Sequence, residues 1–191
     1  MRILGIDPGL RSTGWGVIAC DDGSLRHIAN GAIQPKPSLA DADRLGVIFN
    51  ELDNVIAQHK PSQAAIEQIF VAKSAGSALR LGMARGVGLL VCGMNGLVVD
   101  EISARAVKKA VAGTGTAEKK QVQDMVTRLL AVTAENADAA DALAIAIAAS
   151  NDAGKLADVG VGLGKGEAAG GLSTAIAAAL VRDGARNGGK T

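Results

Sequence analysis

Aromatic residues are scarce in this chain of 191 residues, which has one Trp, two Phe and no Tyr. A buried core therefore has to be built from Ala, Val, Ile and Leu. Hydrophobic residues make up 48% of the chain and charged residues 20%, which permits such a core and excludes a wholly disordered chain. The length suits one ordinary domain with a tail, and it is short for two full domains.

Cysteine and histidine are equally rare, with two residues of each. Cys20 and Cys92 are too few and too far apart for a disulfide framework or a zinc site. The two His residues also lack the spacing of metal ligands. The longest apolar stretch, residues 86–99, is interrupted by Gly and Asn and is too short to span a bilayer. Because MRILGIDPG shows no pattern of a secretory signal, we expect a cytoplasmic protein with no membrane partner.

Excess charge of one sign is also missing, since the net charge is only +1. Such a balance argues at first against a nucleic-acid partner. The charges are unevenly distributed, however, because residues 73–128 contain nine Lys and Arg but four Asp and Glu. A basic segment in a chain whose acids gather elsewhere is typical of a phosphate-binding enzyme with hard cations. Solvated helix faces explain many of these charges equally well.

The spacing of apolar residues predicts an α/β fold. Strands are expected over residues 2–7, 14–20 and 24–33, with a hairpin at Asp21-Asp22-Gly23. Further elements are expected as a helix over 38–60, strands over 64–68 and 97–102, and helices over 74–94, 103–112, 117–130 and 137–150. A hairpin array followed by alternating helices and strands predicts a mixed five-stranded sheet with helices on both faces.

The composition changes near Asn151. Residues 154–191 are rich in Gly and Ala and contain few large apolar side chains. We therefore expect a structured domain over residues 1–151 and a flexible tail over residues 152–191.

Two predicted strands end in an acid. Asp7 closes an apolar strand before the turn pair Pro8-Gly9, and Glu67 closes another short apolar strand. If these strands are parallel neighbours, both carboxylates reach the same edge of the sheet, where α/β proteins place their sites. A strand-terminal Asp is often only a turn former, so the pair is more informative than either residue alone.

Asp138 and Asp141 lie three residues apart at the start of an Ala-rich helix, so their side chains share one face. An Asp at a helix N-terminus often serves as a cap. One cap needs one Asp, and the remainder of this helix is almost entirely apolar. We therefore expect a cation between these two acids and the sheet. Four carboxylates without nearby His or Cys favour Mg²⁺ or Mn²⁺.

Two Lys residues and one Phe are further candidate site residues. Two Mg²⁺ or Mn²⁺ ions together suit the hydrolysis of a phosphodiester. Lys108 and Lys119 bracket the loop Gly113-Thr114-Gly115, and we expect them at the scissile phosphate of that reaction, although most Lys residues are merely solvated. Phe70 follows Glu67 by three residues, where it suits base stacking as well as a core position.

With these residues the chain resembles the RuvC family of Holliday junction resolvases. The matching pieces lie in order along residues 1 to about 150: GIDPG at 5–9, Thr13-Gly14, AIEQIF at 65–70, ARG at 84–86, Val107-Lys108, AEK at 117–119 and DAADALAIA at 138–146. Together these pieces are highly specific, whereas GIDPG alone is not. The Gly/Ala-rich tail matches nothing in the family.

The resemblance implies a ribonuclease-H-like fold and a homodimer that cuts four-way junction DNA by symmetrical paired nicks. It implies catalytic metals, two Mg²⁺ per subunit with Mn²⁺ as a substitute, at Asp7, Glu67, Asp138 and Asp141. It further implies assistance by Lys119 and Lys108 and contact of Phe70 with a base near the junction centre. On this resemblance, we expect DNA contacts at Phe70, Lys73, Arg80, Lys108 and Lys119. A branch-migration motor of the RuvA and RuvB type is the implied partner.

Three other interpretations stay open. A sugar-kinase-type phosphotransferase also begins with a strand, an acid and a Gly/Thr-rich hairpin, but it needs two such domains. A non-catalytic junction-binding protein is disfavoured because all four acids are present. An enzyme acting on RNA/DNA hybrids would share the metal site, and only the family resemblance separates it from a resolvase.

Overall fold

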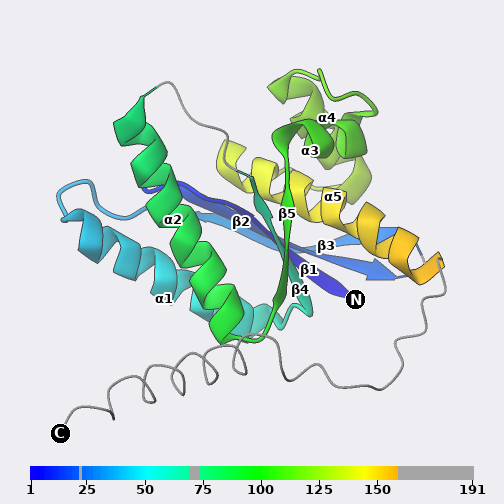
Figure 1. Ribbon diagram of the computed structural model, residues 1–191. Coiled ribbons are helices and arrows are strands. Elements are labelled where there is room, and N and C mark those ends of the chain that lie inside the picture. Colours follow the sequence, from blue (N-terminus) through cyan, green and yellow to red (C-terminus); the bar gives the residue numbers. More distant parts are fainter. Residues whose placement is uncertain (22, 69–73, 159–191) are drawn as a thin grey trace, which may run out of the picture. The chain divides into compact units, whose positions relative to one another are not determined.

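The computed structural model describes residues 1–21, 23–68 and 74–158 of the chain. The predicted DNA contacts Phe70 and Lys73 lie outside these residues. The elements, labelled in Figure 1, are β1 (Arg2–Asp7), β2 (Thr13–Asp21), β3 (Ser24–Ile33), α1 (Asp41–His59), β4 (Gln63–Glu67), α2 (Ala75–Met94), β5 (Val98–Ile102), α3 (Ala104–Ala112), α4 (Lys119–Leu130) and α5 (Ala137–Asp158).

The strands form one five-stranded sheet in the order β3-β2-β1-β4-β5. The hairpin strands β1, β2 and β3 pair antiparallel, whereas β4 pairs parallel with both β1 and β5. The predicted mixed sheet is therefore confirmed. Since β1 and β4 are parallel neighbours, their last residues, Asp7 and Glu67, lie at the same edge of the sheet.

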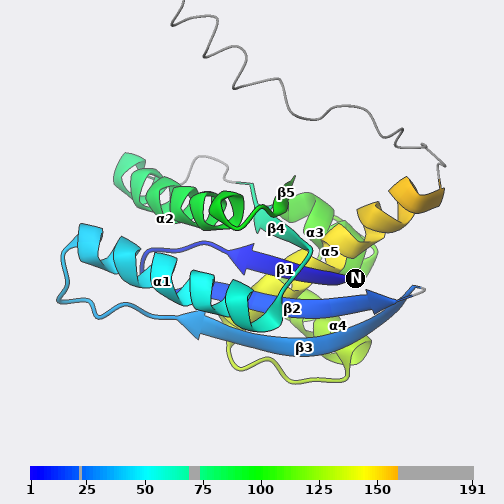
Figure 2. The same ribbon diagram turned by 90° about the horizontal axis from the view of Figure 1, so that it is seen from below.

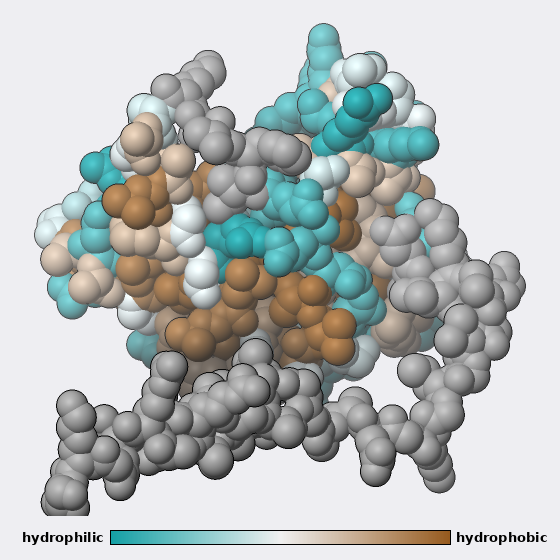
Figure 3. Space-filling model, in the orientation of Figure 1, coloured by the Kyte–Doolittle hydropathy of each residue, from teal (hydrophilic) through white to brown (hydrophobic). Residues whose placement is uncertain are grey.

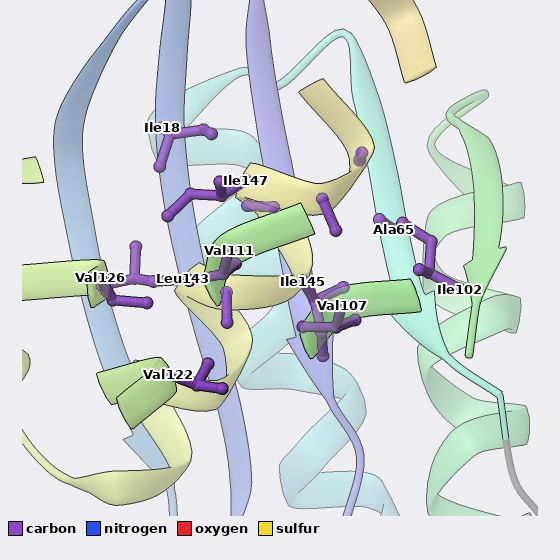
Figure 4. Close-up of a cluster of buried hydrophobic side chains, with 14 of the residues drawn as sticks. Ile18, Ala65, Ile102, Val107, Val111, Val122, Val126, Leu143, Ile145 and Ile147 are labelled. Carbon is purple, nitrogen blue, oxygen red and sulfur yellow. The ribbon is translucent and has the colours of Figure 1, made fainter. Parts of the chain in front are cut away.

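Helices cover both faces of the sheet, as predicted (Figure 2). Successive residues of a strand point to opposite faces, so Ile3 packs with α3, α4 and α5, whereas Leu4 packs with α1 and α2. Figure 4 shows the first of these clusters, in which valines from α3 and α4 surround the apolar side chains of α5. The core is aliphatic, as the shortage of aromatic residues requires.

Helix α5 lies directly on β1 and β2 because glycines face it. A Cβ atom at Gly5 would overlap the carbonyl oxygen of Ala142 and lie 2.7 Å from the amide nitrogen of Ala146. A Cβ atom at Gly14 would overlap the carbonyl oxygen of Asp138. The absence of side chains at these two positions brings the first turn of α5 against the end of the sheet that carries Asp7.

Helix α5 is longer than the sequence pattern predicted, since it runs to Asp158 and not to residue 150. Residues 151–158 contain no Pro, and one Gly weakens a helix without ending it. The domain boundary at residue 151 stays a prediction.

Helix α2 has an exposed apolar surface. Leu79, Leu90 and Met94 are 66%, 55% and 69% exposed, and Val98 at the start of β5 is 70% exposed. Figure 3 shows hydrophobic surface over the lower half of α2 and the adjoining part of β5. Within the described residues, α2 is the single helix that is long enough and apolar enough to cross a membrane, judged by length and composition alone. In its most apolar segment of 18 residues, 22% of the residues are buried.

Candidate active site

Three carboxylates from two elements meet at one edge of the sheet. Asp7 ends β1, while Asp138 and Asp141 lie in the first two turns of α5. One oxygen from each carboxylate lies within 4.8 Å of the others. The chain therefore brings together three of the four predicted metal ligands in a group that fits a metal ion.

The cap of α5 is Asn136, whose side-chain oxygen accepts a hydrogen bond from the Ala139 amide at 2.9 Å. The carboxylate of Asp138 instead accepts a hydrogen bond from the Ser12 hydroxyl at 2.5 Å. Capping thus does not explain Asp138, and its side chain is available to the acidic group.

The fourth acid, Glu67, is not part of the close group of three but lines the same cavity. This cavity has a volume of about 260 Å³. Its lining residues are Asp7, Glu67, Ala104, Val107, Lys108, Lys119, Val122, Asp141, Ala144 and Ile145. Acids therefore face two lysines across a cavity with aliphatic walls. Both predicted catalytic lysines thus line the cavity that carries the acids.

The acids repel one another and are partly withdrawn from water. Burial first, and then the charges of Asp141, Glu67 and Asp138, raise the pKa of Asp7 from 3.8 to about 7. Burial also raises the pKa of Glu67 and of Asp141. The pKa of Lys119 is raised in turn, chiefly by its hydrogen bond to Asp141 at 2.5 Å. The site therefore favours the binding of further positive charge.

Arg85 and Ser12 contact the acids but were not among the predicted site residues. The Arg85 guanidinium donates from Nε to the main-chain oxygen of Glu67 at 3.3 Å and also pairs with Glu101. The ARG motif marked the position of Arg85 without indicating this contact. No sequence pattern pointed to Ser12. Arg80, a predicted DNA contact, is exposed on α2 and does not line the cavity.

Comparison with known proteins gives consistent matches. The family model for crossover junction endodeoxyribonuclease RuvC matches residues 3–149. RuvC of Caulobacter vibrioides is 49% identical over 151 residues, which cover 78% of this chain and 89% of that protein. RuvC of Paramagnetospirillum magneticum is 53% identical over 148 residues, with coverages of 77% and 89%. The structure of T. thermophilus RuvC in complex with a Holliday junction substrate is similar with a TM-score of 0.75 and 30% identity, covering 80% of this chain and 94% of that one.

Proposed function

The chain belongs to the RuvC family of crossover junction endodeoxyribonucleases, and we infer from its site how it cuts Holliday junctions in recombination and repair. The family resemblance and the ribonuclease-H-like fold expected from the sequence are both confirmed. We propose that the enzyme hydrolyses phosphodiester bonds at the carboxylate cavity and introduces symmetrical paired nicks. The observation that carries this proposal is the group of Asp7, Asp138 and Asp141 beside Lys119.

The donor set fits Mg²⁺. Carboxylate oxygens are the ligands that hard divalent cations prefer, and neither His nor Cys lines the described cavity. Asp7, Asp138 and Asp141 would hold the metal, with Glu67 from β4 completing a site for a second Mg²⁺. When bound, the cations activate water and neutralise charge on the phosphate, and Mn²⁺ serves as a substitute.

The lysines act on the substrate in this proposal. Lys119 exchanges its bond to Asp141 for the scissile phosphate and stabilises the negative charge that grows on it in the transition state. Lys108 binds the same phosphate from α3 and orients it. The aliphatic walls of the cavity strengthen both interactions because they exclude water.

We assign the other DNA contacts by position in the chain. Phe70 and Lys73 follow Glu67, so a base stacked on Phe70 and a phosphate bound by Lys73 would lie near the metal-binding acids. Exposed Arg80 on α2 binds a more distant phosphate. On this proposal the junction centre would lie beside the end of β4.

We propose that the enzyme is a homodimer joined through α2. Leu79, Gly82, Gly86, Leu90 and Met94 recur every three or four residues and form one exposed stripe along the helix. A Cβ atom at Gly82 or Gly86 would meet nothing within 4 Å, so a second helix has room to approach closely. A two-fold dimer would give one site per subunit, which matches the need for paired nicks. A bilayer is a poor partner for this helix, since Arg80 and Arg85 lie within it.

The proposed activity also suggests a partner and a location in the cell. A junction cut at one position by a dimer requires a machine that moves the junction, which is the task of a branch-migration motor of the RuvA and RuvB type. Because its proposed substrate is chromosomal DNA of a bacterial type of cell, we propose that the enzyme acts in the cytoplasm.

The decisive experiment is cleavage of a synthetic four-way junction with Mg²⁺ and with EDTA, beside a linear duplex and an RNA/DNA hybrid. We expect paired nicks in the junction alone, and only with the metal. Cleavage of the hybrid in place of the junction would contradict the proposed substrate. Cleavage in EDTA would contradict the proposed metal site.

A further inference from the structure

The hydroxyl of Ser12 donates a hydrogen bond of 2.5 Å to Oδ2 of Asp138. This distance is typical of a strong bond between a hydroxyl and a charged carboxylate. We propose that Ser12 is a positioning residue that holds Asp138 as a ligand with one available oxygen, and thereby sets the affinity and selectivity of the metal site. This inference rests on the metal site proposed above.

The loop that carries Ser12 is fixed on both sides. The side chain of the next residue, Thr13, is fully buried, donates to the Gly9 carbonyl oxygen at 2.8 Å and accepts from the Gly9 amide at 3.3 Å. Gly14 then lies against the main chain of Asp138, where even a Cβ atom would not fit. The position of Ser12 relative to α5 is therefore determined by the main chain, and its hydroxyl is held in place before any cation binds.

This contact has a consequence for coordination. If Oδ2 stays bonded to Ser12, Asp138 has one oxygen left, Oδ1, to offer to a cation that it holds together with Asp7 and Asp141. Mg²⁺ and Mn²⁺ suit carboxylates that bind through one oxygen in near-octahedral geometry. Ca²⁺ is larger and accepts carboxylates that bind through both oxygens. The Ser12 hydroxyl would thus favour the smaller cations and prevent Asp138 from rotating into a two-oxygen mode.

A simpler interpretation is that the bond only joins the loop to α5. Asn136 already caps the helix, and Gly14 already packs against its first turn, so the Ser12 bond is not needed for either contact. The two interpretations differ in what they predict for metal binding. A purely structural bond would change the melting temperature and leave the affinity for metal unchanged.

The test compares Ser12→Val with Ser12→Thr, which have nearly the same shape but differ in the hydroxyl. Ser62→Val serves as the control, since the Ser62 hydroxyl donates a hydrogen bond to the Arg2 carbonyl oxygen at 3.1 Å. Ser62 precedes the first residue of β4, at the end of the strand opposite to Glu67. Binding of Mn²⁺ to the full chain without DNA is measured by electron paramagnetic resonance, and Mg²⁺ and Ca²⁺ by competition. The melting temperature in EDTA reports folding, and Asp7→Asn shows which Mn²⁺ belongs to the site.

We expect Ser12→Val to bind Mn²⁺ and Mg²⁺ about tenfold more weakly, as is usual when a contact that orients a ligand is lost. Ca²⁺ should be affected less, and Ser12→Thr should retain most of the wild-type affinity. Equal affinities in Ser12→Val and wild type, with or without a lower melting temperature, would overturn the role of Ser12 while leaving the metal site intact. Absence of Asp7-dependent Mn²⁺ binding in the wild type would overturn both.

Discussion

The ammonium nitrogen of Lys119 lies 2.5 Å from Oδ2 of Asp141, in the cavity that Asp7 and Glu67 also line. This ion pair places the positive charge of the Lys119 ammonium beside the acids. The Lys119 side chain is 60% exposed, so the pair contributes little to stability. We propose that the pair serves catalysis, because the ammonium is available when a phosphate enters the site.

We predict that Lys119→Ala lowers the single-turnover rate of junction cleavage on the order of 10²-fold, because a charge that stabilises the transition state is lost. The Kd for the junction in EDTA should change by only a few-fold. Lys120→Ala is the matched control, since Lys120 is the next residue of α4 and does not line the cavity. Equal losses in rate and binding would make Lys119 a phosphate anchor with no special role in the transition state.

Asp7→Asn should abolish cleavage while the junction is still bound, because the amide cannot replace a carboxylate ligand. The same change should alter stability in a predictable direction. The pKa of Asp7 is raised from 3.8 to about 7, so the folded protein holds this proton more tightly than the unfolded chain does. The free energy of unfolding therefore falls as the pH rises from about 4 to about 7, and then levels off.

The amide that replaces the Asp7 carboxyl cannot ionise, so in EDTA at pH 8 the Asp7→Asn variant should be more stable than the wild type by about 2–4 kcal/mol. The difference should be much smaller at pH 4, where Asp7 is protonated in the folded protein and partly protonated in the unfolded chain. Added Mg²⁺ should narrow the difference at pH 8, because only the wild type gains the full free energy of metal binding. Urea denaturation at both pH values measures this, and a wild type more stable than the variant in EDTA would contradict it.

The sequence predicted the order of the elements and the acids at the sheet edge, but not the full length of α5 or the contacts that orient the acids. Asp7 and Glu67 were predictable because the ends of two apolar strands identify one sheet edge, and the parallel pairing of β1 and β4 bears this out. Ser12 was not predictable, because its bond to Asp138 joins residues 126 positions apart. Arg85 was missed because it donates a hydrogen bond to the main-chain oxygen of Glu67, and no pattern of side chains in the sequence reveals such a contact.

Gly5→Ala should destabilise the protein because the added methyl group would collide with the main chain of α5 at Ala142. Overpacking of this kind typically costs about 1–3 kcal/mol, and here it would also move Asp138 and Asp141 away from Asp7. We therefore expect both a lower free energy of unfolding and weaker Mg²⁺-dependent cleavage.

Gly46→Ala is the control for Gly5→Ala, because Gly46 lies in α1 with nothing within 4 Å of the added Cβ atom. This change should stabilise the protein by about 0.5–1 kcal/mol, since Ala favours a helix more than Gly does. Similar urea midpoints for the two variants would contradict the direct contact of α5 with β1.

Leu90→Glu should dissociate the proposed dimer, because it places a charge in the centre of the exposed stripe on α2. Sedimentation should show a monomer, and nicks on the two strands of a junction should become uncoupled. Leu129→Glu, at a 41% exposed position of α4, should leave the mass unchanged. A Leu90→Glu protein that sediments like the wild type would place the dimer interface elsewhere.

The Arg85 side chain links α2 to the main chain of Glu67, and the variant Arg85→Lys tests what this link contributes. Lysine keeps the charge but cannot reach the Glu67 carbonyl and the Glu101 carboxylate at once, as the guanidinium does. The main chain at Glu67 would lose an anchor, so we expect cleavage at saturating Mg²⁺ to slow by about tenfold with an unchanged Kd for the junction.

Glu101→Gln is the informative partner of Arg85→Lys, because it removes the ion pair and leaves the bond to the Glu67 carbonyl. Cleavage by this variant should be close to that of the wild type. If instead Arg85→Lys weakens junction binding and leaves the rate at saturating Mg²⁺ unchanged, Arg85 contacts a DNA phosphate. The rate at saturating Mg²⁺ and the Kd in EDTA together separate a residue that orients Glu67 from one that binds the substrate.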